Sequence, residues 1–483
     1  MPKTCRPWRA ELALGILLAF CPCAFALDPS LDINQYAHTA WKIRDGFSKG
    51  RIKSIIQTPD GYLWLGTEFG LLRFDGVRVV RWQPPADQRL PSSDIWSLLA
   101  ARDGTLWIGT SKGLASWKDG KLTQHGELAG EYIFRLLEDH EGTVWAGTIG
   151  IPAGKLCAIR NGIVQCSGVD AAGRAILGLY EDRKGNLWVG VLNGLWRWKP
   201  GAPKFYALPG EPNGIRALAE EDDGALLIGM RGGIRRFVDG KTEAYPLSGP
   251  VRQFEAEMVL RDHDGGLWIG SSKQGLLHVH QGTTDVFSQS DGLSGDGDQT
   301  IFEDREGNIW VASSDGLDRF RDFDVATLSV KQGLSNAEVA SVLAARDGSV
   351  WLSTASGLDR WNNSQIAIFG GQGGKLGGQN PNSSFQDSRG RIWVSTSREF
   401  GYLENDRFVS VSSFPGASYV RSIAEDTAGN LWIANFPLGL FQLRGESVVQ
   451  RIPWAKLGRK DFGDALAADP LQGGIWLQKV LAY

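Results

Sequence analysis

The sequence lacks an excess of charge of either sign. Its 483 residues include 51 Lys and Arg against 54 Asp and Glu, a formal net charge of -3. Proteins that bind nucleic acid or anionic membrane surfaces carry basic patches that attract phosphate, so this balance offers no electrostatic case for either partner. Methionine, with 3 residues, and histidine, with 6, are also scarce.

Long hydrophobic runs are absent after the N-terminus. A basic start precedes the short apolar stretch Leu12–Phe20, and Ala24 and Ala26 place small residues at the two positions that a signal peptidase reads. This pattern predicts a secretory signal peptide over residues 1–26, too short to span a membrane. The alternatives are a buried N-terminal helix or a lipoprotein that begins at Cys21. We expect an exported, periplasmic protein.

Motifs of common enzyme classes are missing. The sequence has no Gly-x-Ser-x-Gly, no phosphate-binding P-loop and no dinucleotide-binding glycine motif. His278 and His280 alternate on one face of a predicted strand, but no third metal ligand is evident near them in the sequence. We therefore predict no catalytic residue, no cofactor and no metal. A glycosidase, which needs only two suitably spaced carboxylates, stays open as an alternative.

Cysteine is rare: after the predicted signal peptide the sequence contains only Cys157 and Cys166. They flank Asn161-Gly162, and Asn-Gly between two apolar runs is a strong hairpin signal. Counting outward from this turn places the two cysteines opposite each other at a non-hydrogen-bonded position, where side chains approach most closely. In an oxidising compartment this register predicts a disulfide. Two small buried thiols are the alternative.

Glycine, with 62 residues, and tryptophan, with 19, are abundant and recur in a repeat. Each copy has an acidic residue and a glycine turn, then (Leu/Ile/Val)-Trp-hydrophobic-(Gly/Ser/Ala)-(Thr/Ser), then Gly-Leu and a second turn, as in residues 103–120. With Leu227 in one tryptophan slot, eleven copies start at intervals of 38 to 44 residues. The anchor tryptophans are Trp64, Trp107, Trp145, Trp188, Trp268, Trp310, Trp351, Trp393, Trp432 and Trp476. Apolar neighbours on both sides indicate that they pack between sheets.

Four short strands in each copy are typical of a β-propeller blade. Because propellers usually close with four to eight blades, we predict an all-β fold with tandem propellers: seven blades over residues 27–325 and an incomplete second ring of about four blades over residues 326–483. Residues 39–43 align with the outer strand at 284–288, so we expect them to complete the seventh blade. The pattern is lost after Gln478, which suggests a fragment or a prematurely terminated product.

The repeated Asp-x-x-Gly-x-Leu-Trp-(Ile/Leu/Val)-Gly-Thr-x-x-Gly-Leu pattern resembles the two-component regulator propeller repeat over about residues 36–478. This resemblance implies the periplasmic input region of a hybrid or sensor histidine kinase, in a signal-transduction phosphorelay. It also implies a small-molecule or oligosaccharide ligand, a membrane-anchored output module in the full-length protein, and a possible homodimer. The chain itself would be non-catalytic. The alternatives are a periplasmic polysaccharide hydrolase or lyase and a standalone envelope scaffold.

A ligand surface is expected where the loops entering the inner strands converge. The residue thirteen positions before each anchor marks this entry, and it differs in chemistry from copy to copy. Variable side chains on a repeated scaffold are typical of a specific ligand site, and also of neutral drift on solvated loops. On this basis we predict Arg51, Asp94, Tyr132 and Glu255 as ligand-binding residues.

Overall fold

The computed structural model is all-β, as predicted. It describes residues 27–477 except 29–30, 152, 169–174, 209–213, 249–250, 252–253, 298, 323–326, 363–364, 370–375, 377–379, 406, 416–419, 459–464, 470 and 472. The predicted signal peptide lies outside these residues. The only helices described are short 3-10 turns, and none is long and apolar enough to span a membrane.

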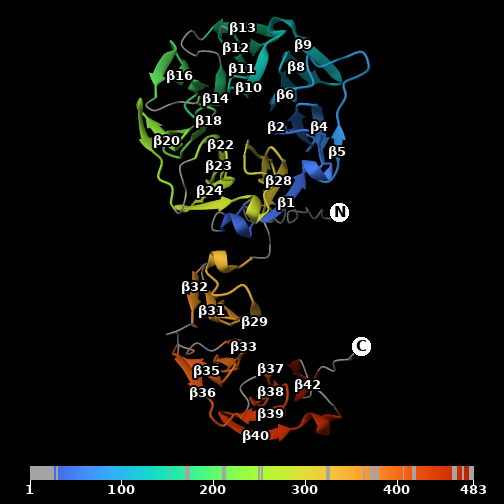
Figure 1. Cartoon of the computed structure of the whole chain (residues 1–483), viewed down its shortest axis with the longest axis vertical. Coiled ribbons are helices and arrows are strands. Elements are labelled where there is room, and N and C mark those ends of the chain that lie inside the picture. Colours follow the sequence, from blue (N-terminus) through green and yellow to red (C-terminus); the bar gives the residue numbers. More distant parts are fainter. Residues whose placement is uncertain are drawn as a thin grey trace, which may run out of the picture. The chain divides into compact units, whose positions relative to one another are not determined.

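Two compact units divide the chain, residues 1–326 and residues 327–483. In the first unit, four-stranded antiparallel sheets follow one another around a ring (Figure 1). Each sheet is one blade. Within a blade the inner strand lies nearest the centre of the ring, and each following strand of the sheet lies further out. Blades one to four contain β2 (Ile52–Gln57), β3 (Leu63–Thr67), β4 (Gly70–Phe74) and β5 (Val79–Arg81); β6 (Ile95–Ala100), β7 (Leu106–Thr110), β8 (Gly113–Lys118) and β9 (Lys121–His125); β10 (Tyr132–Glu138), β11 (Val144–Ile149), β12 (Lys155–Arg160) and β13 (Ile163–Gly168); and β14 (Ile176–Glu181), β15 (Leu187–Val191), β16 (Gly194–Lys199) and β17 (Lys204–Ala207).

The remaining blades of the first unit follow the same plan. They contain β18 (Ala217–Glu220), β19 (Leu226–Met230), β20 (Gly233–Val238) and β21 (Lys241–Ala244); β22 (Ala256–Arg261), β23 (Leu267–Ser271), β24 (Leu276–His280) and β25 (Thr283–Phe287); and β26 (Thr300–Glu303), β27 (Ile309–Ala312) and β28 (Gly316–Arg321) with β1 (Ala37–Lys42). The 3-10 turns are η1 (Ile33–Gln35), η2 (Ile43–Asp45), η3 (Gly126–Leu128) and η5 (Gln289–Asp291).

The N-terminal strand β1 completes the last sheet of the first unit. It pairs antiparallel with β28, with Trp41 opposite Leu317, so the outer strand predicted at residues 39–43 lies where the alignment placed it. The first and last sheets also pack together, because β2 contacts β26 and β27. The sheets of the first unit therefore form a closed ring.

The second unit repeats the blade in an open series. Its sheets are β29 (Val339–Ala344), β30 (Val350–Thr354), β31 (Gly357–Asn362) and β32 (Gln365–Ile368); β33 (Pro381–Gln386), β34 (Ile392–Thr396), β35 (Phe400–Glu404) and β36 (Arg407–Ser410); β37 (Val420–Glu425), β38 (Leu431–Asn435), β39 (Gly439–Arg444) and β40 (Ser447–Ile452); and the pair β41 (Leu466–Ala468) and β42 (Ile475–Leu477). The 3-10 turns η6 (Val330–Gln332) and η7 (Trp454–Leu457) connect or flank these sheets.

Each blade core depends on the anchor tryptophan and the glycine two residues after it. Trp268 and Trp393 are fully buried, as expected of side chains packed between sheets. A Cβ atom on Gly109 would lie 2.8 Å from Cγ2 of Ile133 in the next blade, so glycine here permits the close approach of neighbouring sheets.

An aspartate six residues before the anchor fixes the turn. In blade three, Asp139 accepts hydrogen bonds from the backbone N–H of Glu141 and Thr143 and, at 2.7 Å, from the indole Nε1 of Trp145. The same indole bond recurs for Trp188, Trp268, Trp310, Trp393 and Trp432. These acidic residues therefore stabilise the turn, and hydrogen bonds within the blade occupy their carboxylates.

A hydrogen bond from a backbone N–H to a side chain of the next blade joins several neighbouring blades and also joins the ends of the ring. The N–H of Arg102 donates to Glu138 at 2.8 Å, and the N–H of Arg183 donates to Glu220 at 2.8 Å. The equivalent bond from Arg305 to Oε1 of Gln57, at 2.9 Å, joins the last sheet to the first. The same type of contact that joins neighbouring blades therefore also joins the last blade of the ring to the first.

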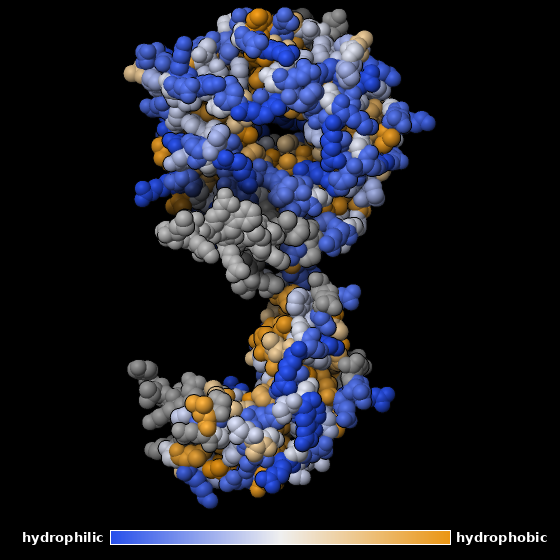
Figure 2. Space-filling model, turned by 180° about the vertical axis from the view of Figure 1, so that it is seen from behind, coloured by the Kyte–Doolittle hydropathy of each residue, from blue (hydrophilic) through white to orange (hydrophobic). Residues whose placement is uncertain are grey.

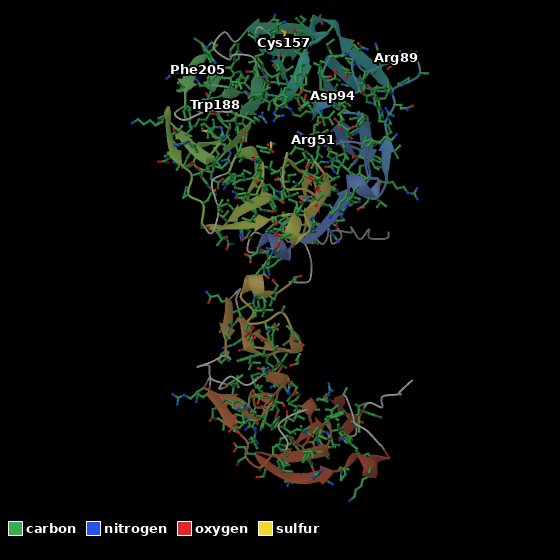
Figure 3. The ribbon with its side chains drawn as sticks, viewed as in Figure 1. Arg51, Arg89, Asp94, Cys157, Trp188 and Phe205 are labelled. Atoms are coloured by element: carbon green, nitrogen blue, oxygen red, sulfur yellow. A yellow bond between two sulfur atoms is a disulfide. The ribbon has the colours of Figure 1, made fainter. Side chains whose placement is uncertain are left out.

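Cys157 and Cys166 lie opposite each other on β12 and β13, in the register counted from the Asn161-Gly162 turn. Their sulfur atoms are bonded, at 2.04 Å. Figure 3 shows Cys157 in the outer part of the first unit. The disulfide joins the two outer strands of one blade, away from the centre of the ring.

Candidate functional site

A cavity of about 320 Å³ lies where the inner strands of the first unit converge. Figure 2, from behind, shows a hollow at the centre of this unit. Every blade of the ring contributes to its lining: Arg51, Lys53, Trp96, Tyr132, Phe134, Arg135, Ile149, Leu177, Arg216, Glu257, Met258, Gln299 and Thr300. The cavity falls within the size range of small-molecule sites.

One position in the repeat supplies one lining residue from each blade. The residue eleven before each anchor, counting Leu227 as the fifth anchor, always borders the cavity. We call these residues the channel ring: Lys53, Trp96, Phe134, Leu177, Arg216, Glu257 and Gln299.

A β-bulge explains why this position faces the cavity. The pairing of β2 with β3 skips Lys53, and the pairing of β6 with β7 skips Trp96. Phe134, Leu177 and Glu257 occupy the same skipped position in their blades. A bulge re-aims the side chain of the extra residue, so the scaffold can turn one variable side chain per blade toward the axis.

Three of the four predicted ligand residues gather at this cavity. Arg51 and Tyr132 line it. Asp94 lies beside it, since its Oδ1 is 2.5 Å from Nζ of Lys53 and its Oδ2 accepts a 2.9 Å bond from Nε1 of Trp96. Figure 3 shows Arg51 and Asp94 on the inner side of the ring. The Lys53 ammonium also lies 3.7 Å from the centre of the Trp96 ring, a cation–π contact that holds the indole in place.

Glu255 lies elsewhere. It borders a separate surface groove with Arg231, Phe254 and Lys273, and pairs with Arg231 in an isolated β-bridge. Glu257, two residues further on, faces the central cavity instead. The side chains of the two glutamates therefore belong to different surfaces of the same unit.

The side chains that line the cavity include a neutral phenol and two neighbouring cations. Burial raises the pKa of Tyr132, and Asp94 adds to this, so the phenol stays protonated at neutral pH. Burial lowers the pKa of Arg135 to about 10, and the positive charge of Arg216 contributes. Arg135 therefore remains a cation at neutral pH, close to a second cation.

Sequence reasoning predicted none of the seven channel-ring residues, and the missing signal was the bulge. The entry position chosen from the repeat, thirteen residues before each anchor, lies two residues before the channel ring, and the bulge that aims the ring residue at the cavity appears only in the strand pairing. The channel ring could have been found only with the pairing register of the inner strands known.

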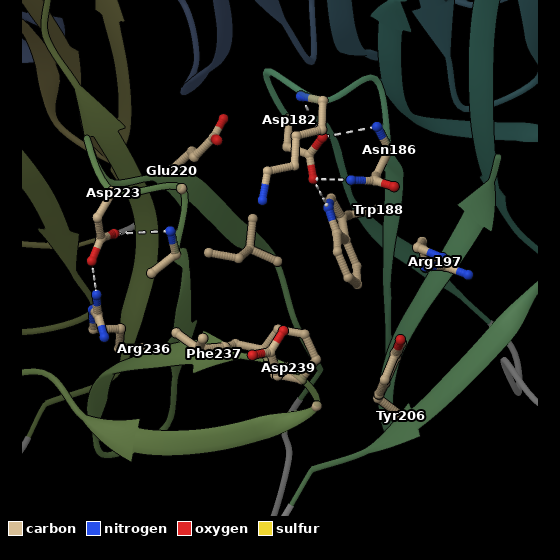
Figure 4. A pocket seen from close by; sticks show the side chains of 16 residues that line it. Asp182, Asn186, Trp188, Arg197, Tyr206, Glu220, Asp223, Arg236, Phe237 and Asp239 are labelled. Carbon is tan, nitrogen blue, oxygen red and sulfur yellow. Dashed lines mark hydrogen bonds and ion pairs between the residues drawn. The ribbon is translucent and has the colours of Figure 1, made fainter.

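A second cleft lies between blades four and five and is shown in Figure 4. Asp182 there accepts bonds from Asn186 Nδ2 at 2.7 Å and Trp188 Nε1 at 2.8 Å. Asp223 accepts from the backbone of Ala225 at 3.0 Å and pairs with Arg236. Both carboxylates are held by turn and ion-pair contacts, so this cleft offers no free acid–base pair from them.

The histidine pair has a nearby carboxylate that the sequence reading did not find. His278, His280 and Asp285 present ligand-type atoms within 4.8 Å of one another. Burial, with a contribution from His280, lowers the pKa of His278 to about 3, so its ring is neutral. Asp285 is 2.9 Å from Nε2 of His280 and accepts from the N–H of Ile33 at 2.9 Å. These bonds tie the N-terminal segment to blade six, and the absence of a metal in this chain stays a prediction.

Family comparison agrees with the repeat. Residues 46–69, 89–112, 127–150, 171–193 and 413–436 match the model of the two component regulator propeller. Five segments of the chain therefore match the repeat that the sequence pattern resembles. A search of curated proteins finds no match.

Solved structures with the same fold include extracellular domains of signalling proteins. The chain is 19% identical, with a TM-score of 0.60, to the extracellular domain assigned to a hybrid two component system of B. thetaiotaomicron, and the match covers 92% of this chain and 70% of that domain. A second such domain, assigned to a one component system of the same organism, has 17% identity, a TM-score of 0.50 and coverage of 92% and 65%. Virginiamycin B lyase from Staphylococcus aureus has 13% identity, a TM-score of 0.50 and coverage of 60% and 100%. At these identities the likeness is one of fold.

Proposed function

We propose that this chain is the exported, ligand-sensing input region of a two-component receptor and is itself non-catalytic. The observation that carries the proposal is the channel ring, in which each blade turns one chemically different side chain toward a shared cavity. Such an arrangement can be matched to one ligand while the blades stay constant. The proposed site contains Arg51, Asp94 and Tyr132, and the proposed ligand is a small molecule or an oligosaccharide.

The receptor architecture is the second part of the proposal. Residues 27–325 form a complete seven-bladed propeller, and residues 326–483 belong to an incomplete second one of about four blades. The full-length protein carries a membrane-anchored output module, such as a histidine kinase, and works on the periplasmic side of the membrane, with a homodimer as its working state. Its resemblance in fold to extracellular domains assigned to a hybrid two component system and to a one component system supports this arrangement.

A lyase is the second candidate, because virginiamycin B lyase shares the fold. One solved form of that enzyme is described as catalytically inactive after a histidine-to-alanine substitution. The cavity here has no histidine among its described lining residues. Tyr132 is kept protonated and cannot act as a base at neutral pH. These features favour binding without turnover.

The test is a panel of saccharides added to the purified secreted chain, with thermal unfolding and mass spectrometry of the solution read in parallel. A sensor ligand at 100 times its Kd should stabilise the chain by about 2.7 kcal/mol while its own mass stays unchanged. Arg51→Ala should weaken binding. Glu255→Ala is the matched control, because Glu255 borders a different groove. Steady product formation that Tyr132→Phe or Glu257→Gln abolishes would replace the sensor proposal with an enzyme.

A further inference from the structure

The channel ring is divided into two chemically different halves. Blades two, three and four contribute Trp96, Phe134 and Leu177, all apolar or aromatic. Blades five, six, seven and one contribute Arg216, Glu257, Gln299 and Lys53, all polar or charged. A ligand in this cavity therefore meets an apolar wall on one side and hydrogen-bonding groups on the other.

The apolar wall is built from aromatic rings that pack edge-to-face or tilted against one another. Trp96 packs against Tyr132 at 5.0 Å and against Phe134 at 5.8 Å between ring centres. Trp96 is further held by its bond to Asp94 and by the Lys53 ammonium. Rigid aromatic faces of this kind suit the apolar C–H face of a sugar ring and lose little entropy on binding.

Two arginines at the cavity have no carboxylate partner among the described residues. Arg135 donates only to the carbonyl oxygen of Phe134, at 3.3 Å, and no ion pair to an acid involves it or Arg216 in the described part of the chain. By contrast, the guanidinium of Arg236 in the same unit is neutralised by carboxylates. It forms ion pairs with Glu221, Asp223 and Glu243. Glu257 also lines this cavity, but neither guanidinium forms an ion pair with it among the described residues. The two neighbouring cations can therefore receive an anion, and their planar forks match a carboxylate.

Gln299 borders the cavity but is nearly buried, with 5% of the residue exposed. Its Nε2 donates to the carbonyl oxygen of Gly295 at 3.4 Å, and its Oε1 lies close to Gly270 in the neighbouring blade. The carboxamide is therefore held within the wall, and the two arginines and the aromatic side chains are the groups that a ligand meets.

We propose that the central cavity binds an acidic sugar, a hexuronate unit whose carboxylate lies between Arg135 and Arg216 and whose apolar face packs on Trp96 and Tyr132. This inference rests on the proposed sensing function and names the ligand class of the same site. The unit is either a free monosaccharide or the end of a short oligouronide, because both present the same carboxylate and ring face.

The experiment is calorimetric titration of the purified secreted chain with galacturonate, glucuronate, trigalacturonate, galactose and methyl galacturonate ester. At least one uronate should bind about 10- to 100-fold more tightly than galactose or the ester, which lack the charge. Its affinity should fall as NaCl is raised. Comparison of galacturonate with trigalacturonate identifies a free sugar or a chain end as the preferred form.

Matched variants locate the carboxylate. Arg216→Gln and Arg135→Gln should each weaken uronate binding about tenfold or more and leave any binding of galactose unchanged. Arg216 is exposed, so its variant is expected to fold, and thermal unfolding of each variant checks this. Arg78→Gln, an exposed arginine outside the cavity, is the control and should bind like the parent protein.

Two results would overturn the inference. One is a uronate that binds no more tightly than galactose or does not bind. The other is uronate binding that is insensitive to both arginine variants. Binding of galactose alone, with Arg51→Ala weakening it, would leave the sensing function standing and discard the acidic ligand. Conversion of trigalacturonate into products would discard the sensing function while the charge preference could still be read from the variants.

Discussion

The two units use the same repeat but bury it differently. The anchor Trp268 on β23, in the closed ring, has no exposed surface, whereas Trp476 on β42 is 65% exposed. The inner strand β18 of the first unit is buried throughout, but β29 of the second unit alternates between exposed and partly exposed residues, and Val342 is 64% exposed. The repeat therefore specifies a strand and its turn, while burial depends on having a blade on both sides.

The largest expected effect tests this dependence on neighbours. Trp268→Ala should lower the free energy of unfolding of the first unit by about 3–5 kcal/mol, because it removes a fully buried side chain. Trp476→Ala, at the equivalent repeat position, should change stability by within about 0.5 kcal/mol because its ring is mostly in solvent. Urea unfolding, with hydrogen exchange in peptides from each unit, measures both. Equal losses would show that the anchor acts through its own strand and not through its neighbours.

The disulfide gives the next largest difference between the units. Cys157→Ser with Cys166→Ser should destabilise the first unit by about 2–3 kcal/mol through the added freedom of the unfolded chain. The second unit has no cysteine, so its unfolding should be unchanged. A reductant added to the parent protein should reproduce the effect. A change in the unfolding of the second unit after addition of the reductant would contradict this prediction.

Ring closure can be weakened with a smaller loss. The Arg305 guanidinium donates to the carbonyl oxygens of Thr58, at 2.9 Å, and Pro59, at 3.1 Å, and so links the last blade to the first. Arg305→Ala should cost about 1 kcal/mol. It should speed hydrogen exchange in both β2 and β26. Arg346→Ala, which removes the similar bond to Ser388 in the second unit, should affect only its own two neighbouring sheets.

The smallest effect is a difference in acid dependence between two anchor-binding aspartates. Burial raises the pKa of Asp262, so its carboxylate is less favourable in the folded state and its contribution to stability falls as pH rises above about 3.8. For Asp387, burial also raises the pKa, but Trp393 and Arg391 outweigh it and lower the value. Its contribution is present above its usual range and is lost as pH falls through the lowered pKa.

The measurement is the stability difference between the parent chain and Asp262→Asn or Asp387→Asn from pH 2.5 to 6. The two differences should change with pH in opposite directions. Slopes of the same sign would mean that Arg391 does not distinguish the two turns.

Much of the scaffold followed from local chemistry. The Asn161-Gly162 turn determined which residues face each other across β12 and β13, and the spacing of Trp and glycine marked every blade. The match between residues 39–43 and an outer strand located β1 before any pairing was known. Each of these inferences needed only a turn type or a repeat period.

The cavity was harder to predict because it depends on register and on distant partners. The bulge that turns Trp96 and Phe134 inward appears only in the pairing of two strands, so counting from the anchor placed the entry two residues too early. Glu255 was chosen by that count, whereas Glu257 faces the cavity. Asp285 beside His280 was missed for a related reason, since the two residues meet across a hairpin.

The pairing of β1 with β28 also has a consequence for biosynthesis. His38 on β1 and Asp318 on β28 lie diagonally across that pairing, with 2.9 Å between Nε2 and Oδ1, and are 280 positions apart in the chain. At about 5–20 residues per second of synthesis, the first strand waits roughly 15–55 s before its partner exists. During that interval it is an unpaired edge, which other chains could add to. The first strand to emerge is therefore the last to join its sheet, and the ring becomes complete only after the seventh blade has left the ribosome.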